Sequence, residues 1–110
     1  MHLLPRVVGW LDYADRMSNA RLPGAELVEL GLRDLKANEL SDEALAVLAA
    51  APRLRRAGLD VPVGADEVGA SQRLYLSLAE QLGDRAHGRH HAIMRRVVSY
   101  ASASARSRDR

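Results

Sequence analysis

Three histidines near the C-terminal end of the chain have the spacing of side chains that share one face of a helix. His90 and His91 follow His87 by three and four residues, and neutral imidazoles placed in this way can coordinate a metal ion. Asp84, three residues before His87, could add a carboxylate oxygen. The same positions also continue an apolar stripe that includes Met94, so packing or an interface is the simpler role. We therefore predict no metal site and no cofactor.

Other residue types that carry catalysis are absent or poorly grouped. The chain has no cysteine, which excludes thiolate chemistry, disulfides and cysteine-based zinc sites. Its carboxylates mostly stand beside arginines or in the first turns of predicted helices, where surface pairs and caps are the usual roles. Ser41, Ser71 and Ser77 have neither a neighbouring base nor a glycine-rich turn that would indicate a nucleophile. These patterns predict that the protein is not an enzyme.

Charge is distributed unevenly along the chain. Residues 1–50 carry five basic and eight acidic side chains, residues 51–110 carry eleven and six, and all but one of the basic residues are arginine. A basic C-terminal region fits an anionic partner, which leaves RNA, DNA or an acidic protein surface open. The arginines that would neutralise phosphates on the last predicted helix are Arg85, Arg89, Arg95 and Arg96. A small helical DNA-binding transcriptional regulator is therefore an alternative function.

Some side chains lie off the apolar stripes of their predicted helices and indicate a surface for a partner protein. Leu30, Leu76 and Tyr100 are of this kind, and the histidine-bearing turn widens another stripe. The candidate partner-binding residues are Leu30, Tyr75, Leu76, His87, His90, His91, Met94 and Tyr100. Contact with another protein is the main function that this pattern favours.

Helices must position these residues, because the composition leaves few other solutions. Phenylalanine is absent and the aromatic residues are one Trp and three Tyr, so the core must be built from Leu, Val and Ala. Apolar residues recur at helical spacing in the windows 5–19, 25–37, 41–51, 67 or 70 to 82, and 84–103. A short turn of helix at 53–58 follows Pro52, and residues 59–68 form a long irregular connection that is a candidate hinge.

Short signals mark the ends and contacts of these helices. Ser41 before two acids is typical of an N-cap, and Asn38 and Gly58 are typical of helix ends. Gly31 lies on the apolar side of its helix, where a glycine costs stability unless it allows another helix to approach closely. We therefore predict a close helix crossing at Gly31.

The domain organisation follows from length and composition. With 110 residues the chain fits one small domain, and we predict an all-α fold of four to five helices. Residues 1–103 form a helical interaction domain, and residues 104–110 form a frayed, disordered Arg/Ser/Ala tail. Pro5 and Arg6 break the apolar start, which is too short for a signal or a membrane span. Together with the lack of cysteine, this predicts a cytoplasmic protein without membrane contact.

Three segments of the chain together resemble a known family. They are residues 51–62, 73–75 and 86–100, which read APRLRRAGLDVP, RLY and AHGRHHAIMRRVVSY. In this order they are similar to the MenA-type antitoxins of MenAT toxin–antitoxin modules, small bacterial proteins whose genes neighbour nucleotidyltransferase-like toxins. The likeness covers about residues 25–100, and the family pattern expects Tyr-Asn where His90-His91 stands.

The resemblance implies an antitoxin without catalytic residues, which binds and neutralises a cognate nucleotidyltransferase toxin that acts on tRNA. A toxin that handles tRNA and nucleoside triphosphates needs a basic cleft, and the acidic first half of this chain could complement it. The acids concerned are Glu26, Glu29, Asp34, Glu39, Asp42 and Glu43. The basic C-terminal helix would then contact an acidic toxin surface or operator DNA, and a homo-oligomer is also open.

Overall fold

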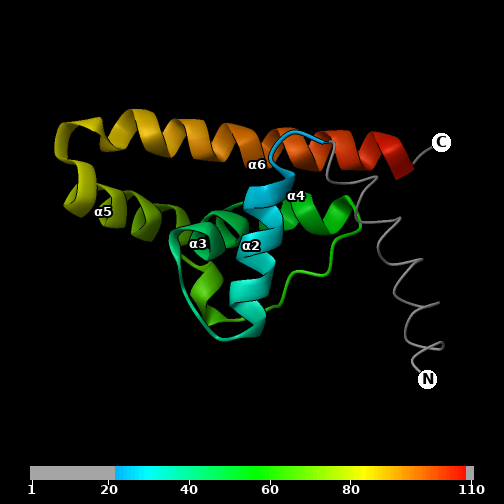
Figure 1. Ribbon diagram of the computed structural model, residues 1–110. Helices are drawn as coiled ribbons and strands as arrows, with labels where there is room; N and C mark the ends of the chain where they lie inside the picture. Colours follow the sequence, from blue (N-terminus) through cyan, green and yellow to red (C-terminus); the bar gives the residue numbers. More distant parts are fainter. Residues whose placement is uncertain (1–21, 109–110) are drawn as a thin grey trace, which may run out of the picture.

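Five α-helices and two short 3₁₀ helices make up the structure, a computed structural model that describes residues 22–108 (Figure 1). The elements are α2 (Ala25–Lys36), α3 (Asp42–Ala49), α4 (Ala51–Arg56), η1 (Ala65–Glu67), α5 (Ala70–Leu82), η2 (Gly83–Arg85) and α6 (Ala86–Arg108). These described residues contain no strand, which confirms the predicted all-α fold. The helix predicted at 5–19 lies outside the described residues.

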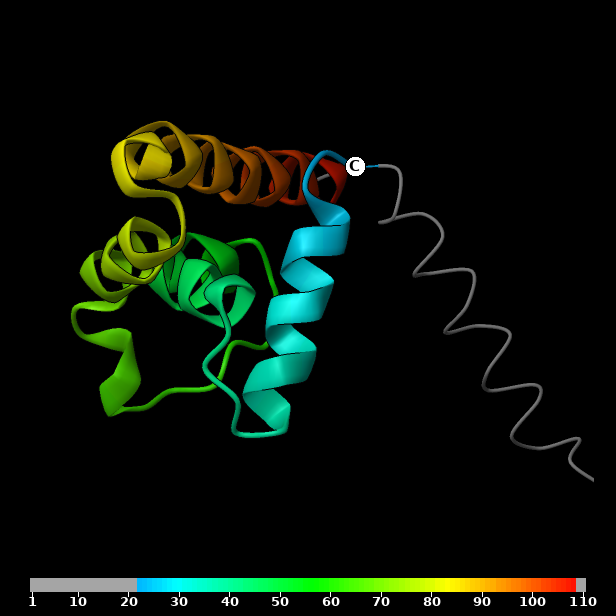
Figure 2. The ribbon, with the colours of Figure 1, turned by 60° about the vertical axis from the view of Figure 1, so that its left-hand side comes forward.

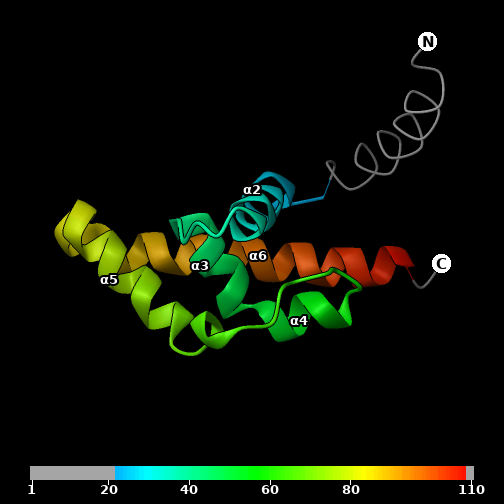
Figure 3. The same cartoon turned by 90° about the horizontal axis from the view of Figure 1, so that it is seen from below.

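The longest helix, α6, has 23 residues and extends along one side of the molecule (Figure 1). The other four α-helices lie on one side of it in that view, and α5 leads into α6 through η2. α3 is central, because it contacts α2, α4, α5 and α6. Figure 2 shows α2 running away from α6 with its start beside it, and Figure 3 shows α2 and α4 on opposite sides of α6. Across residues 22–108, no helix has the length and apolar character needed to cross a membrane.

The core is built from Leu, Val and Ala, as the composition predicts. Val28 of α2, Val47 of α3, Leu54 of α4, Leu74 of α5 and Val97 of α6 are its largest fully buried side chains. Each of the five helices thus contributes one of them. Because full burial of a Leu or Val side chain stabilises a fold by about 1.5–3 kcal/mol, this shared core fixes the helices relative to one another.

The predicted helix ends are confirmed. Asn38 takes a left-handed conformation (φ 61°) after α2, and the N–H groups of Asn38 and Glu39 donate to carbonyl oxygens of the last turn at 3.1 and 2.8 Å. The Ser41 hydroxyl accepts a hydrogen bond from the Ala44 N–H at 3.1 Å and caps α3. Gly58, with φ 97°, follows α4 in the same way. These contacts satisfy main-chain groups that helix termini leave without partners.

Residues 59–68, the candidate hinge of the sequence, are fastened to α4 by one side chain. The Arg55 guanidinium donates to the carbonyl oxygens of Val61 and Pro62 at 3.2 and 3.0 Å. It also donates two hydrogen bonds to the Glu67 carboxylate, at 2.8 and 3.2 Å, and this contact raises the pKa of Arg55. The hinge stays a prediction, and in this structure a bidentate ion pair links the end of the segment to α4.

The last helix is longer than the sequence predicts. α6 continues to Arg108, whereas we expected a disordered tail from residue 104 onward. Ser104 is buried, and Ala101 lines a small hollow together with residues of α4. Contact with α4 stabilises turns that have little apolar content of their own. This corrects the prediction for the helical residues, and residues 109–110 lie outside the described part of the chain.

Candidate binding groove

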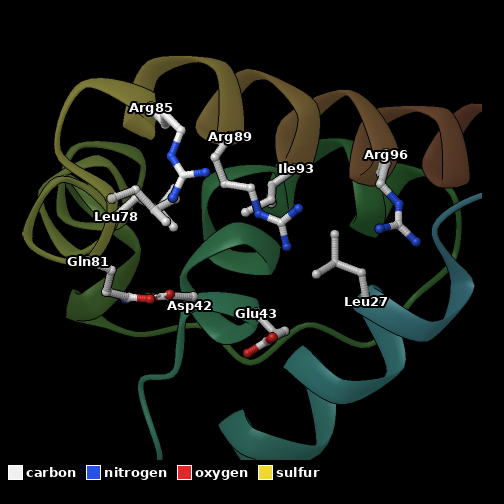
Figure 4. A pocket seen from close by; sticks show the side chains of 10 residues that line it. Leu27, Asp42, Glu43, Leu78, Gln81, Arg85, Arg89, Ile93 and Arg96 are labelled. Carbon is white, nitrogen blue, oxygen red and sulfur yellow. Dashed lines mark hydrogen bonds between the residues drawn. The ribbon is translucent and has the colours of Figure 1, made fainter.

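A groove lies between the first half of α6 and the helices α2, α3 and α5 (Figure 4). Its volume is about 610 Å³, which is enough for several side chains of a bound molecule. We call it the arginine groove, and its lining residues are Leu27, Asp42, Glu43, Leu78, Gln81, Leu82, Arg85, Arg89, Ile93 and Arg96. Charged side chains form its two walls, and apolar side chains lie between them.

One wall of the arginine groove carries three arginines. Arg85 lies in η2, and Arg89 and Arg96 of α6 follow it by four and eleven residues, spacings that return to the same face of a helix. Figure 4 shows the three side chains extending from this side over the groove. All three are exposed, and none has a hydrogen bond or an ion pair with another of the residues 22–108. Their N–H donors are therefore free to bind an anionic group.

The opposite wall is the first turn of α3. Asp42 and Glu43 stand there after the Ser41 cap, where the positive end of the helix dipole favours carboxylates. The Asp42 carboxylate accepts hydrogen bonds from the Ser77 hydroxyl at 2.7 Å and the Gln81 amide at 3.0 Å, both from α5. The Glu43 carboxylate accepts none from the described residues. This wall presents one carboxylate that is held in place and one that is free.

Apolar side chains form the floor between the two walls. Leu78 and Ile93 are buried in the floor, and Leu27 and Leu82 are half-buried at its edges. A floor of this kind between walls of opposite charge favours a ligand that combines apolar groups with separated charges. A small, uniformly charged anion would leave the floor without a contact.

Two glycines, one at the start of α2 and one within it, allow α2 to lie close to both walls. A Cβ at Gly31 would lie 2.5 Å from both the Glu43 carbonyl oxygen and a Val47 methyl group, which confirms the predicted close crossing. A Cβ at Gly24 would clash in the same way with the Arg96 carbonyl group, and the φ of 79° at Gly24 also favours glycine. α2 is thereby held against the main chain of both α3 and α6.

The structure brings together three of the four arginines that the sequence marks as phosphate contacts. Arg85, Arg89 and Arg96 line the groove and Arg95 does not, because adjacent residues on a helix point about 100° apart. The spacing of the three arginines is therefore a signal that the sequence contains. The sequence does not predict the apolar floor, since its leucines fit a core stripe equally well. It also contains no pattern that indicates a role for Gln81.

The residues predicted to contact a partner protein differ in exposure. Leu30, Tyr75 and Leu76 are exposed, at 38%, 39% and 56%. Tyr100 is only 3% exposed, so its assignment to an open binding surface is wrong. Gly24, at the start of α2, lies close to the Tyr100 Cβ. Helical periodicity could not reveal this, because Gly24 comes from a distant part of the chain.

Ser71 has a histidine neighbour that the sequence alone does not reveal. His90 Nε2 of α6 lies 3.2 Å from the Ser71 hydroxyl oxygen and 3.1 Å from the Ser71 carbonyl oxygen of α5. Because a carbonyl oxygen only accepts hydrogen bonds, the contact with the Ser71 carbonyl requires the tautomer with the proton on Nε2, and in that tautomer Nε2 donates in both contacts. A protonated nitrogen cannot take the hydroxyl proton, so the pair joins two helices and is not arranged for nucleophilic catalysis.

The other two histidines of the cluster have a different setting. His87 and His91 are exposed, whereas His90 is half-buried and meets Tyr75 edge-on, with 5.9 Å between ring centroids. In the described part of the chain, no three side chains of His, Cys, Asp or Glu are grouped so that they could hold a metal ion. The contacts that the structure gives to His90 are those of helix packing.

Comparison with known proteins adds no family to this description. The chain matches no model of a protein family, no curated protein and no solved structure. The interpretation of the arginine groove therefore depends on its geometry and its charges.

Proposed function

We propose that this protein acts by binding a partner protein, and that the arginine groove is the place of contact. The observation that carries the proposal is the set of three unpaired guanidinium groups beside an apolar floor. Arginine is among the residues that contribute most to protein interfaces, and the buried centre of an interface is more apolar than its rim. Following the resemblance of the sequence, the partner is a nucleotidyltransferase toxin and this protein is its antitoxin.

A second charged surface supports a toxin of this kind as the partner. Glu26 and Glu29 of α2 are exposed, so the molecule offers acids on α2 and arginines on α6. A toxin that handles tRNA needs a basic cleft, and exposed carboxylates complement such a cleft. In this proposal, inhibition follows from covering the cleft or from holding the toxin in an inactive conformation.

The same groove gives less support to the alternative of a DNA-binding regulator. Asp42 and Glu43 face the arginines across the groove, and carboxylates repel the phosphates of a duplex. Arg95, the fourth arginine of that alternative, lies outside the groove. A protein ligand, which can bring both acids and apolar groups, fits this surface better.

Co-expression with the protein encoded by the adjacent gene tests the proposal. We expect a complex that survives purification and growth that is restored when the adjacent protein is toxic. Arg96→Glu should weaken the complex by about 30-fold, because it places a carboxylate where the partner's acids bind. Arg95→Glu changes the neighbouring residue outside the groove and should alter the affinity by less than about 2-fold.

Two results would contradict the proposal. The first is the absence of both a complex and growth rescue. The second is tight binding of the protein to its own promoter DNA, weakening steeply as salt rises and impaired equally by Arg95→Glu and Arg96→Glu, which is the behaviour of phosphate contacts. That result would support the regulator instead.

A further inference from the structure

We propose that the arginine groove receives an amphipathic helix of the partner, bound in one orientation only. This inference rests on the proposed function in one respect, namely that the partner is a protein. The helix would carry acids along the edge that faces α6, apolar side chains toward the floor, and a basic side chain at the edge that faces Glu43. The class of ligand is thus an acidic, amphipathic helical segment.

The orientation follows from the unequal walls. The α6 wall holds three guanidinium groups, and the α3 wall holds the free Glu43 carboxylate beside Asp42, which Ser77 and Gln81 already engage. A segment turned the other way would place its acids against Glu43 and its base against the arginines. Like charges at close range disfavour that arrangement.

A helix fits the spacing of the arginines and an extended strand does not. At a rise of about 1.5 Å per residue, Arg89 lies about 6 Å from Arg85 along the axis, and Arg96 lies about 10 Å further. An antiparallel helix with acids at i, i+7 and i+11 reproduces these intervals on one face. A strand rises about 3.3 Å per residue, so its matching positions would be two and then three residues apart, and the third acid would point to the opposite side.

The size of the groove agrees with a helix that rests on its rim. A volume of about 610 Å³ is smaller than a helical cylinder of about 16 Å length and 10 Å diameter. The groove therefore takes the side chains of one helix face, and the main chain of the bound helix lies above it. Leu27, Leu78 and Ile93 contact the apolar side chains that enter.

A synthetic helical peptide of about 18 residues tests this inference on the full-length protein. Three glutamates at i, i+7 and i+11 form one edge, leucines form the adjacent face, and one lysine stands at the other edge. The control peptide has the same composition with the glutamates moved to the far face. In fluorescence anisotropy, we expect the first peptide to bind at least about 10-fold more tightly than the control.

Matched protein variants locate the contact. Arg96→Glu should weaken binding of the first peptide by about 10-fold or more, and Arg95→Glu by less than about 2-fold. Exchanging the three glutamates of the peptide for lysines should restore binding to a protein that carries Arg85→Glu, Arg89→Glu and Arg96→Glu. Circular dichroism of each variant is the control for folding: with an unchanged helix signal, a loss of binding reports the groove.

Three outcomes would overturn the inference. Both peptides could bind equally, the two adjacent arginine variants could lose binding equally, or inorganic triphosphate or duplex DNA could displace the peptide with a steeper salt dependence, as at a polyanion site. Failure of the proposed function is distinguishable. If the adjacent gene product binds and depends on Arg96, but the first peptide binds no better than the control, the helix inference fails alone. If the peptide binds in register and the adjacent gene product does not bind, the antitoxin proposal fails alone.

Discussion

Arginine has two opposite roles in this molecule, at α4 and at α6. Arg55 donates four hydrogen bonds, two to main-chain carbonyl oxygens and two to the Glu67 carboxylate. Arg85, Arg89 and Arg96 donate none to the described residues. The side chains of Arg55 and Glu67 are 30% and 25% exposed, whereas the three groove arginines are exposed. The first region uses its cation to hold a loop, and the second keeps its cations available.

The difference shows why the number of arginines says little about function. A guanidinium group whose donors are used within the fold has little left for a ligand. A guanidinium group without a partner in the fold keeps its donors for an external anion. The folded structure shows which arginines have partners within the protein. This distinguishes an arginine that holds a loop from arginines that are available to a ligand.

The largest effect on stability is expected at Gly31, where α2 crosses α3 beside the groove. Gly31→Ala should lower the free energy of unfolding by about 2–3 kcal/mol, because the new Cβ would lie 2.5 Å from the Glu43 carbonyl oxygen. Urea denaturation measures the loss. Gly88→Ala is the matched control, since its Cβ meets nothing within 4 Å and should stabilise α6 by about 0.5–1 kcal/mol. Equal stability of wild type and Gly31→Ala would show that α2 and α3 do not cross this closely.

A smaller effect on stability is expected when the contacts of Arg55 with residues 61–67 are removed. Arg55→Ala should lower the Tm and speed amide exchange in residues 61–68, because the segment loses its links to α4. Binding of the acidic peptide should stay unchanged, since Arg55 does not line the groove. Arg89→Ala is the control and should give the reverse pattern. If both variants lowered the Tm alike, the contrast between the two regions would be lost.

Two histidines of α6 show the same contrast between a side chain with contacts in the fold and an exposed one. His90→Ala should lower the free energy of unfolding by about 0.5–1 kcal/mol, because it removes the contacts to Ser71 and Tyr75. His87→Ala, at an exposed position of α6, should have no measurable effect. Chemical denaturation compares the two variants. A larger loss for His87→Ala would show that the cluster packs differently from the structure.

The smallest effect is expected at the groove arginines themselves. Arg85→Ala and Arg96→Ala should each change the free energy of unfolding by less than about 0.5 kcal/mol, since neither side chain has a partner among residues 22–108. The same variants should weaken binding of the acidic peptide. A clear loss of stability would mean that these arginines belong to the scaffold, as Arg55 does.

The sequence predicts most of the helices because their signals are local. The Ser41 cap, the Asn38 end and the break between α3 and α4, which lies at Ala50 just before Pro52, each depend on residues within one turn. Gly31 also predicts a close crossing, although the sequence does not say with which helix. Local chemistry of this kind needs no knowledge of the rest of the fold.

The sequence could not predict what depends on packing between distant segments. Tyr100 is buried beside Gly24 at the start of α2, and the end of α6 lies against α4. The groove itself needs α2, α3, α5 and α6 together, so its arginine wall is visible as a spacing and its floor is not. Ser71 and His90 are likewise brought together by the pairing of α5 with α6.

The glycine contacts of α2 bear on how this surface could acquire a new partner. At Gly24 and Gly31, the main chain of α2 lies against the carbonyl groups of Arg96 and Glu43, which stay the same when the side chains of those two residues are exchanged. The separation of the two walls is therefore insensitive to which side chains point into the space between them. Exchanging Arg96, Glu43 or Leu27 would rewrite the pattern of charge and shape offered to a ligand while the frame that holds it keeps its dimensions.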